Sequence, residues 1–232
     1  MNPDRKESVI IVAGGKGLRA GGELPKQFQS IGGMPMLMHT LLAFHRYNVQ
    51  MKIVVVLPAG FQSFWEELCV THHFSVQHNL VQGGETRFHS VKNGLALIAD
   101  DEIVAVHDAA RPFVSTALIS RCFEAAKIHD CGVIPVVEET NSVRQLTGSG
   151  SCMLDRKQLR LVQTPQVFPA AKIKRAYTTS FDPAFTDDAS VVEREGCPIL
   201  LVEGEENNFK ITSPFDWTVA ESWYQNFIKT IE

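Results

Sequence analysis

The sequence predicts an α/β domain with a largely parallel sheet covered by helices on both faces. Short runs of β-branched residues alternate with amphipathic stretches along most of the 232-residue chain. The runs, such as Lys52–Leu57, are almost continuously apolar, as expected of strands that are buried on both sides. Right-handed crossovers place the loops that follow such strands along one edge of the sheet. Ligands bind at that edge in folds of this class, so we expect the site there.

The expected elements follow this alternation in order along the chain. We predict strands at residues 8–13, 52–57, 75–81, 103–106, 132–137 and 199–202. We predict helices at residues 35–47, 61–69, 85–99, 115–129 and 170–178, a short helix that residues 185–188 begin and that ends at 195, and a last helix from 214 to 231. Ser115 is the expected N-cap of its helix, because a serine hydroxyl accepts a hydrogen bond from an unpaired N–H of the first turn.

Residues 138–163 interrupt this alternation. Residues 141–146 and 152–154 are strand-like and flank Thr147-Gly148-Ser149-Gly150, which is typical of a hairpin. An isolated two-stranded hairpin is only marginally stable in water. This favours an arm that reaches a partner subunit over a surface hairpin without a role. The chain has no internal repeat, low-complexity tract or linker, so we expect one domain over residues 1–232 with an arm of about 138–163 inserted.

A glycine-rich loop directly follows the first expected strand. Residues 12–19 read Val-Ala-Gly-Gly-Lys-Gly-Leu-Arg, and Lys26 comes soon after, behind a proline. Glycines allow backbone N–H groups to approach phosphate oxygens, and two cations can neutralise charge on a phosphate under attack. In this interpretation Gly14 to Gly17 wrap a triphosphate while Arg19 and Lys26 bracket its α-phosphate. From this segment alone, the alternative is a tight strand-to-loop turn with two solvated cations.

Two other nucleotide motifs fit this loop less well. The P-loop string G-x-x-x-x-G-K-[S/T] does not occur in the sequence. Gly15-x-Gly17-x-x-Ala20 matches a dinucleotide fingerprint, which requires an acidic residue at the end of the second strand. The second expected strand ends in Pro58-Ala59-Gly60, with no acid. An NAD(P)-dependent oxidoreductase is therefore a weaker alternative.

Composition argues against several other classes of protein. Hydrophobic residues make up 44% of the chain and charged residues 21%, as in soluble globular proteins, and the formal net charge of −4 predicts no bulk attraction to nucleic acid or to an anionic membrane. No apolar run approaches the roughly 20 residues that span a bilayer, and residues 1–7 lack the apolar segment of a signal peptide. The five scattered cysteines are typical of reduced thiols in a cytoplasmic protein. Residues 71–73 with His78 read as a polar loop rather than a zinc site.

Two later segments, residues 83–87 and 107–111, are expected at the same edge, and two more carry polar residues. Asp108 and Arg111 follow a strand, and they fit either contacts to a polyol, ribose or phosphate or an Asp–Arg pair that stiffens the loop. Gly83-Gly84-Glu85, ahead of a helix, fits an anion or base contact or a simple strand-to-helix turn. Residues 186–190 are accounted for as a helix start, and Lys210 as a solvated lysine, unless both join the same site.

Taken in order, these motifs resemble those of the 2-C-methyl-D-erythritol 4-phosphate cytidylyltransferase family of non-mevalonate isoprenoid biosynthesis. The resemblance spans nearly the whole chain and rests on residues 13–19, 25–27, 83–90, 107–112, 164–166, 186–190 and 208–212. It implies a nucleotidyltransferase with a three-layer, Rossmann-like α/β domain and a β-hairpin arm, here residues 138–163, that interlocks a homodimer. A ribitol-5-phosphate cytidylyltransferase is the alternative with the same chemistry. Such enzymes tend to carry valine where this chain has Ala110.

The resemblance also implies roles for individual residues. Arg19 and Lys26 are implied to stabilise the transition state at the α-phosphate of CTP. Nucleotide contacts are implied for Ala13, Gly14, Gly15, Lys16, Gly17, Gly83, Gly84, Glu85 and Ser90. Contacts to methylerythritol phosphate are implied for Asp108, Arg111, Thr140, Arg156, Thr164, Thr186 and Lys210, with Thr140 and Arg156 acting from the arm on the partner's site.

The expected reaction is a direct displacement, in which the acceptor's phosphate oxygen attacks the α-phosphorus of CTP and expels pyrophosphate. A phosphate monoester has a second pKa of about 6 and is largely dianionic at neutral pH, so no protein nucleophile or general base is required. Mg²⁺ is expected to bridge the phosphates and to keep most of its ligands as water and phosphate oxygens, so no residue is assigned as a metal ligand. The presence of both Arg19 and Lys26 disfavours a non-catalytic nucleotide-binding module.

Overall fold

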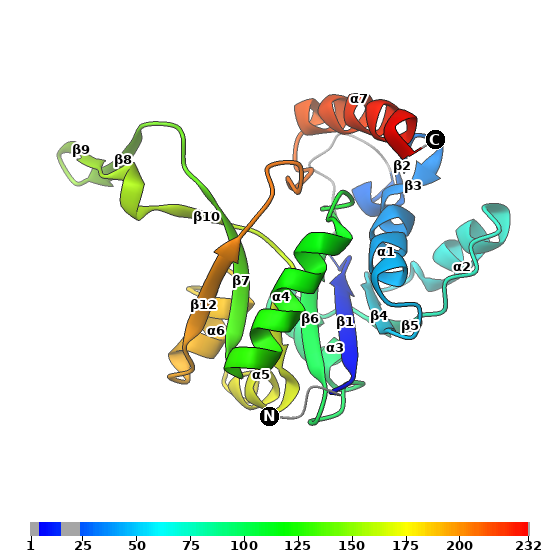
Figure 1. Cartoon of the computed structure of the whole chain (residues 1–232), viewed down its shortest axis with the longest axis horizontal. Helices are drawn as coiled ribbons and strands as arrows, with labels where there is room; N and C mark the ends of the chain where they lie inside the picture. The colour runs from blue at the N-terminus through cyan, green and yellow to red at the C-terminus, as the bar shows by residue number, and fades with distance from the viewer. Residues whose placement is uncertain (1–4, 15–23, 232) are drawn as a thin grey trace.

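The centre of the molecule is an eight-stranded sheet in the order β10-β7-β11-β6-β1-β4-β5, with β12 beside β7 (Figure 1). The structure is a computed structural model that describes residues 5–14 and 24–231, with side chains described up to residue 226. The strands of this sheet are β1 (Glu7–Val12), β4 (Lys52–Leu57), β5 (Asn79–Gln82), β6 (Ile103–Asp108), β7 (Gly132–Glu138), β10 (Arg160–Val162), β11 (Gln166–Pro169) and β12 (Ile199–Glu203). The predicted α/β class is confirmed.

Most of the sheet is parallel, and its register brings two loops together. β1 lies between β4 and β6 and runs parallel to both, so that Val12 is opposite Val56 on one side and Asp108 on the other. β11 runs antiparallel to β6 and β7, and β10 runs antiparallel to β7. Because β1 and β6 end side by side, the segments that begin at Ala13 and Ala109 leave the sheet at the same edge.

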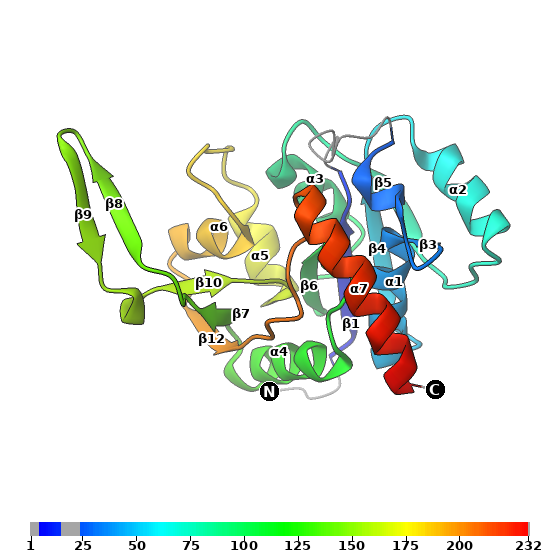
Figure 2. The same cartoon turned by 90° about the horizontal axis from the view of Figure 1, so that it is seen from above.

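Helices cover both faces of the sheet (Figures 1 and 2). One face carries α1 (Met36–Tyr47), α4 (Thr116–His129) and, further out, α2 (Gln62–Thr71). The other carries α3 (Arg87–Leu95), α5 (Ala170–Ala176) and α6 (Asp188–Arg194). The last helix, α7 (Pro214–Ile231), packs near the short hairpin of β2 (Ser30–Ile31) and β3 (Met34–Pro35). This arrangement confirms the predicted covering of the sheet on both faces.

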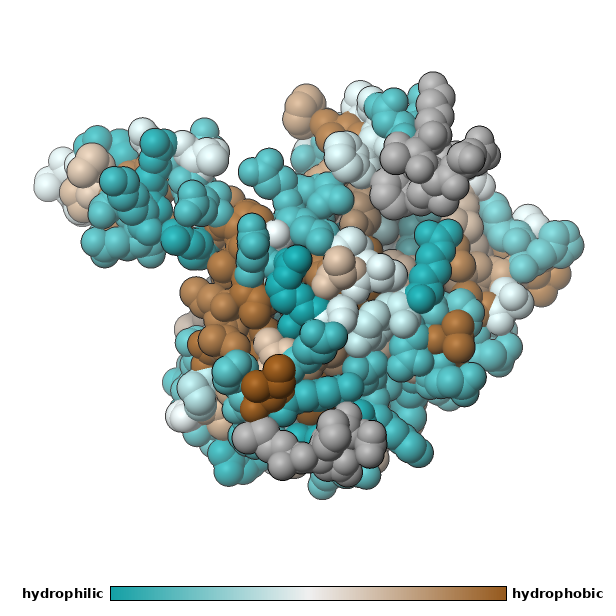
Figure 3. Space-filling model, in the orientation of Figure 1, coloured by the Kyte–Doolittle hydropathy of each residue, from teal (hydrophilic) through white to brown (hydrophobic). Residues whose placement is uncertain are grey.

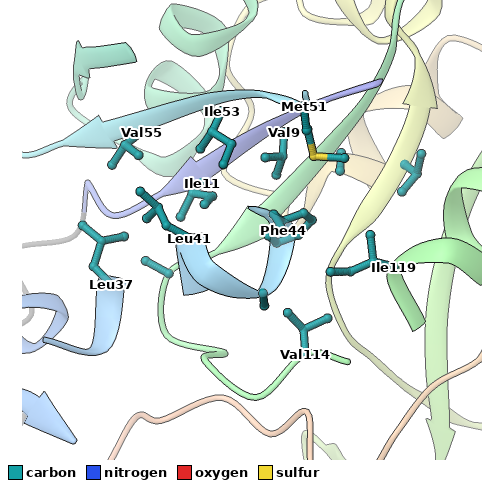
Figure 4. Close-up of a cluster of buried hydrophobic side chains, with 14 of the residues drawn as sticks. Val9, Ile11, Leu37, Leu41, Phe44, Met51, Ile53, Val55, Val114 and Ile119 are labelled. Atoms are coloured by element: carbon teal, nitrogen blue, oxygen red, sulfur yellow. The ribbon is translucent and has the colours of Figure 1, made fainter. Parts of the chain in front are cut away.

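Alternating side chains of β1 build two separate cores. Val9 and Ile11 pack with Leu37 and Phe44 of α1 on one face (Figure 4), whereas Ile10 belongs to the cluster on the α3 face. All of these side chains are fully buried. Successive side chains of a strand point to opposite faces, so a strand covered on both sides must be apolar at every position. This explains why the run was continuous rather than alternating in the sequence.

The hairpin predicted within residues 138–163 is present and projects from the body of the molecule (Figure 2). Its strands are β8 (Val143–Thr147) and β9 (Gly150–Leu154), and a 3-10 turn at Arg156–Gln158 leads back into β10. Leu146 and Met153 on the hairpin are exposed. Hydrophobic surface also gathers beside the base of the hairpin, in the region of β7 and β12 (Figure 3). Exposed Leu161, Val162 and Leu201 belong to the neighbouring strands β10 and β12.

The structure differs from the predicted elements in several places. The predicted strand 75–81 begins only at Asn79, because the His78 ring turns inward to accept a hydrogen bond from the Trp65 indole at 2.8 Å. The predicted helix 85–99 spans only Arg87–Leu95, since Thr86 is its N-cap and accepts a hydrogen bond from the backbone N–H of His89. β10 and β11 were not predicted, because they are three and four residues long and carry little periodic signal. None of the described helices is long and apolar enough to cross a bilayer.

Candidate active site

A pocket of about 700 Å³ opens at the carboxyl ends of β1 and β6. The segment after β1 is held in place from both sides, because the Ala13 N–H donates to Val56 O and the Ala109 N–H donates to Val12 O. The lining residues come from the loops after β1, β5 and β6 and from the segments around Lys26 and Lys210: Val12, Ala13, Gly14, Lys26, Gln27, Met36, Gly84, Glu85, Thr86, Arg87, Ser90, Asp108, Ala109, Ala110 and Lys210. The predicted convergence of the strand-end loops is therefore confirmed for their described residues.

The first wall of the pocket is backbone that packs tightly around Ser90. A Cβ atom on Gly14 would lie 2.8 Å from Ser90 Oγ, and one on Gly83 would lie 3.2 Å from both Ser90 Oγ and Leu57 O. The Ser90 hydroxyl donates to Thr86 O at 3.0 Å and accepts from the Gly84 N–H at 3.1 Å. Ser90 therefore holds the loop after β5 against the start of α3. Glycine at position 14 lets the chain after β1 approach this loop closely.

Lys26 also lines the pocket, from a 3-10 turn of Lys26–Phe28. Its ammonium group donates to Ile211 O at 2.7 Å, next to Lys210 in the chain. The following residue, Gln27, is buried, and its amide donates to Ala13 O at 2.8 Å. The turn is thus tied to the chain after β1, which fixes where Lys26 enters the pocket.

Asp108, the last residue of β6, is surrounded by three cationic side chains. Its Oδ2 lies 2.8 Å from Nζ of Lys210 and 3.8 Å from Nε of Arg111, and its Oδ1 accepts from Nε of Arg87 at 3.4 Å. Burial alone would raise the pKa of this carboxyl, but the charges of Arg87 and Lys210 outweigh it and hold the pKa well below its usual range. Asp108 is therefore an anion that aligns cations at the pocket.

Arg87, the first residue of α3, makes its strongest contact away from the pocket. Its Nη1 and Nη2 donate to the two carboxylate oxygens of Asp188 at 3.0 and 2.6 Å. Asp188 is fully buried and also accepts from the Tyr177 hydroxyl at 2.7 Å. Burial opposes the charge on Arg87, but Asp188 and Asp108 more than compensate and raise the pKa of its guanidinium. This group stays protonated at every pH at which the protein is folded.

A chain of hydrogen bonds fixes the backbone around Asp108. The Asp108 N–H donates to Thr164 Oγ1 at 3.1 Å, and Thr164 Oγ1 lies 3.0 Å from Nδ1 of His107. The other ring nitrogen of His107 lies 3.1 Å from the carbonyl oxygen of Arg111. A carbonyl only accepts, so Nε2 carries the proton and Thr164 donates to Nδ1. Burial lowers the pKa of His107 to about 4, which keeps the ring neutral at pH 7.

The sequence-based assignments fall into four groups in the structure. Ala13, Gly14, Lys26, Gly84, Glu85, Ser90, Asp108 and Lys210 line the pocket. Gly83, Arg111 and Thr164 lie directly behind it, and Arg111 is buried with its Nη1 on Asn208 O at 2.8 Å. Thr140, Arg156 and Thr186 are exposed and do not line this chain's pocket. Gly15, Lys16, Gly17 and Arg19 lie outside the described residues.

Of the two interpretations of the Asp108–Arg111 segment, the structure shows the ion pair, and the substrate contacts stay a prediction. The pairing of Asp108 with Arg111 exists, but the closer partner of Asp108 is Lys210. Thr140 and Arg156 contact each other on the arm, where the Arg156 guanidinium donates to Thr140 O. The roles that the resemblance implies for these residues stay predictions.

Three residues that support the site received no role from the sequence. Arg87 and Gln27 appeared only within motifs, and Asp188 only as part of a motif and a helix start. One signal was available for Asp188: the cap of α6 needs a single acid, and Asp187 supplies it through a capping box with Ser190. Asp188 is therefore not needed for the cap, which indicates that its carboxylate makes another interaction.

Comparisons with known proteins agree with this geometry. The family model described as "IspD: 2-C-methyl-D-erythritol 4-phosphate cytidylyltransferase" matches residues 8–226. The chain is 55% identical over 217 residues to a curated protein of that name from Bacteroides thetaiotaomicron, a match that covers 94% of this chain and 99% of the relative. A homologue of the same name from Geobacillus kaustophilus is 37% identical over 216 residues, with 92% of this chain and 94% of the relative covered.

Solved structures give the same result for the fold. A crystal structure of 2-C-methyl-D-erythritol 4-phosphate cytidylyltransferase from Francisella tularensis superposes with a TM-score of 0.79 at 32% identity and covers 94% of this chain and 99% of that one. A crystal structure of 4-diphosphocytidyl-2C-methyl-D-erythritol synthase from Anaerococcus prevotii gives a TM-score of 0.81 at 25% identity, with 95% and 96% covered.

Proposed function

This chain belongs to the 2-C-methyl-D-erythritol 4-phosphate cytidylyltransferase family, and on that premise we propose that it transfers a cytidylyl group from CTP to 2-C-methyl-D-erythritol 4-phosphate. The products are 4-diphosphocytidyl-2-C-methyl-D-erythritol and pyrophosphate. One observation carries the proposal: glycines of two strand-end loops, Gly14 and Gly84, share a single pocket with Lys26, Asp108 and Lys210. Two phosphate-bearing substrates can therefore meet between cations that come from different loops.

The arrangement suits direct attack by the acceptor's phosphate. That phosphate is already an anion at neutral pH, with a second pKa of about 6, so it needs no base to activate it. Catalysis then consists of aligning two polyanions and stabilising the charge that develops at the α-phosphate. We assign this stabilisation to Lys26, which lines the pocket, and to Arg19. We assign the nucleotide to Glu85 and the backbone of Ala13, Gly14, Gly83 and Gly84, with Ser90 holding the loop after β5, and we propose the same role for Gly15, Lys16 and Gly17.

The acceptor is assigned to the other side of the pocket. Lys210 and Asp108 offer a cation and an anion 2.8 Å apart, which suits a phosphate beside a hydroxyl-rich chain. Arg111 and Thr164 support Asp108 from behind. Thr186 lies ahead of α6, close in the chain to Asp188, and is proposed as a further acceptor contact.

The metal is proposed to enter with the nucleotide. The described residues hold no group of three or more His, Cys, Asp or Glu side chains arranged for a metal ion. Both oxygens of Asp108 already face cations. The donor set does not fit a site made by the protein alone, so CTP is proposed to bind as its magnesium complex, with phosphate oxygens as the main ligands.

A homodimer is proposed to form through the arm within residues 138–163, whose projecting part is the β8–β9 hairpin. Three features support it: a hairpin that leaves the body of the molecule, exposed Leu146 and Met153 on that hairpin, and exposed Leu161, Val162 and Leu201 at its base. Monomeric proteins rarely leave a large contiguous apolar surface open to water. In this dimer Thr140 and Arg156 would reach the partner's pocket. The location that best fits these substrates is the cytoplasm.

Product analysis tests the proposed reaction. Incubation with CTP, magnesium and 2-C-methyl-D-erythritol 4-phosphate is expected to give pyrophosphate and a cytidine diphosphate-linked polyol in equal amounts, read by phosphorus NMR. CTP chirally labelled with sulfur at the α-phosphorus is expected to react with inversion, as a single in-line displacement requires. Retention of configuration would show a covalent enzyme intermediate, and absence of the diphosphate product would refute the transfer itself.

A further inference from the structure

Arg87 connects three segments at and behind the pocket that lie far apart in the sequence. It begins α3, directly after the loop Gly84–Thr86 that lines the nucleotide side of the pocket. Its guanidinium reaches Asp188 at the start of α6 and Asp108 at the end of β6. Asp108 in turn binds Lys210, which follows β12. A single side chain thus joins the nucleotide loop to the residues proposed to hold the acceptor.

The Asp188 end of this connection is fixed independently of Arg87. Gln166 of β11 accepts the backbone N–H groups of Asp188 and Ala189 at 3.0 and 2.9 Å, and its amide donates to Asp187 at 2.9 Å. The Tyr177 hydroxyl holds one carboxylate oxygen of Asp188. Arg87 therefore binds to a preformed anion rather than to a mobile side chain. Its planar fork matches both oxygens of that carboxylate, which sets the orientation of the guanidinium.

The contact of Arg87 with Asp108 is weaker than its contact with Asp188, and it lies at the pocket. With Nη1 and Nη2 held by Asp188, Nε is left to donate to Asp108 Oδ1 at 3.4 Å. This contact restrains the carboxylate on the side opposite Lys210, whose ammonium binds Oδ2. The Arg87 side chain is 29% exposed, whereas that of Asp188 is completely buried, so the connection runs from the interior to the pocket wall.

We propose that Arg87 is a positioning residue for the acceptor: anchored on Asp188, it holds the Asp108 carboxylate and, through it, the Lys210 ammonium in the geometry that receives the acceptor's phosphate and hydroxyls. This inference rests on the proposed function. Arg87 acts through Asp108 and Lys210, because its two terminal nitrogens are occupied by Asp188. Its loss should therefore disturb acceptor binding more than nucleotide binding.

Arg87→Lys is the direct test, because a lysine keeps the charge but cannot bind Asp188 with a fork and Asp108 at the same time. We expect KM for 2-C-methyl-D-erythritol 4-phosphate to rise about tenfold, the size of one lost hydrogen bond to a charged group, with KM for CTP within about twofold of the wild type. Arg194→Lys is the matched control, because Arg194 pairs with Asp182 on the surface of α6, at 2.5 Å, and has no contact with the pocket. It should change neither constant.

Tyr177→Phe supplies a second, milder variant in case Arg87→Lys does not fold. It keeps the ring that stacks on Phe88 and removes only the hydroxyl that holds Asp188. Because Tyr177 does not line the pocket, an acceptor-specific effect must pass through Asp188 and Arg87. We expect a rise of about two- to threefold in acceptor KM alone, as for loss of part of one hydrogen bond.

The outcomes separate this inference from the proposed function. A folded variant that melts at a lower temperature and yet keeps the acceptor KM of the wild type would show that Arg87 is purely structural. That result would overturn the inference. Equal rises in both KM values would overturn it as well. A wild-type protein that releases no pyrophosphate would refute the proposed function, and this inference with it.

Discussion

The ammonium group of Lys210 lies 2.8 Å from Oδ2 of Asp108 at the wall of the pocket. The lysine side chain is 41% exposed and the aspartate only 11%, so a buried anion holds a cation that still faces solvent. Such a pair keeps Lys210 near its binding position before any phosphate arrives. Preorganisation of this kind lowers the conformational cost of binding.

Replacing Lys210 should therefore weaken acceptor binding. Lys210→Met keeps much of the apolar stem and removes the charge. We expect acceptor KM to rise at least tenfold, on the scale of one charge-assisted hydrogen bond, with a smaller change in KM for CTP. Initial-rate kinetics with each substrate varied in turn provide the measurement. A larger rise in KM for CTP than in KM for the acceptor would show that Lys210 binds the nucleotide rather than the acceptor.

Lys26 should act on the rate rather than on binding. Lys26→Ala removes a cation that Ile211 O holds at the pocket, and we expect kcat to fall by roughly 10²–10³-fold, the loss typical of one preorganised donor. Lys174→Ala is the control, since Lys174 binds Asp100 and Ile98 O outside the pocket. Near-normal turnover of Lys26→Ala would contradict the assignment.

Close packing at Gly14 predicts a non-additive pair of variants. A methyl group at Gly14 would meet Ser90 Oγ at 2.8 Å but Ser90 Cβ only at 3.5 Å, an ordinary contact. Gly14→Ala should weaken CTP binding by displacing the loops around Ser90. The double variant Gly14→Ala/Ser90→Ala lacks the Ser90 hydroxyl that the new methyl group would meet. Its loss of CTP binding free energy should therefore be smaller than the sum of the losses in the two single variants. Calorimetric titration with CTP measures all three variants, and simple additivity would argue against this contact.

His107 gives the folded protein a defined response to acid. Burial lowers its pKa in the folded state to about 4, whereas an unfolded histidine titrates near 6.5, so the unfolded state binds more protons between these values. Stability is therefore full above about pH 6.5 and falls by up to about 3 kcal/mol as the pH drops toward 4. The lowered pKa of Asp108 adds a loss only below about pH 4.

Urea denaturation across this pH range measures the effect. His107→Gln removes the titrating group, and the free energy of unfolding should then change less between pH 6.5 and 4 than in the wild type. His129→Gln, at an exposed position at the end of α4, serves as the control. An identical pH slope in wild type and His107→Gln would show that another group causes the loss.

The arm makes a prediction about shared sites. If Arg156 acts on the partner's pocket and Lys26 on its own, Lys26→Ala and Arg156→Ala homodimers each lack two working sites. A mixed dimer then has one intact site, so reassembly of equal amounts should recover about a quarter of wild-type activity. If a mixture that is shown to contain mixed dimers recovers no activity, Arg156 does not act on the partner's site. A monomer in light scattering would contradict the dimer itself.

Much of this molecule could be predicted from sequence, and the exceptions have physical causes. The continuous apolar runs gave the parallel strands, and Ser115 caps α4 as expected by accepting from the Leu118 N–H at 3.0 Å. β11 escaped prediction because four residues next to prolines show no period. Asp188 and Arg87 escaped because their pairing joins helix starts that only the folded sheet brings together. A long-range ion pair produces no recognisable pattern in the local sequence, whereas a strand or a helix cap does.

The rate of pyrophosphate release with different acceptors tests the central claim most directly. The protein is mixed with CTP and magnesium, and the rate is compared for 2-C-methyl-D-erythritol 4-phosphate, ribitol 5-phosphate and no acceptor. We expect fast release with the first acceptor and only background release in the other two reactions. Release with ribitol 5-phosphate alone, or with neither acceptor, would contradict transfer to 2-C-methyl-D-erythritol 4-phosphate.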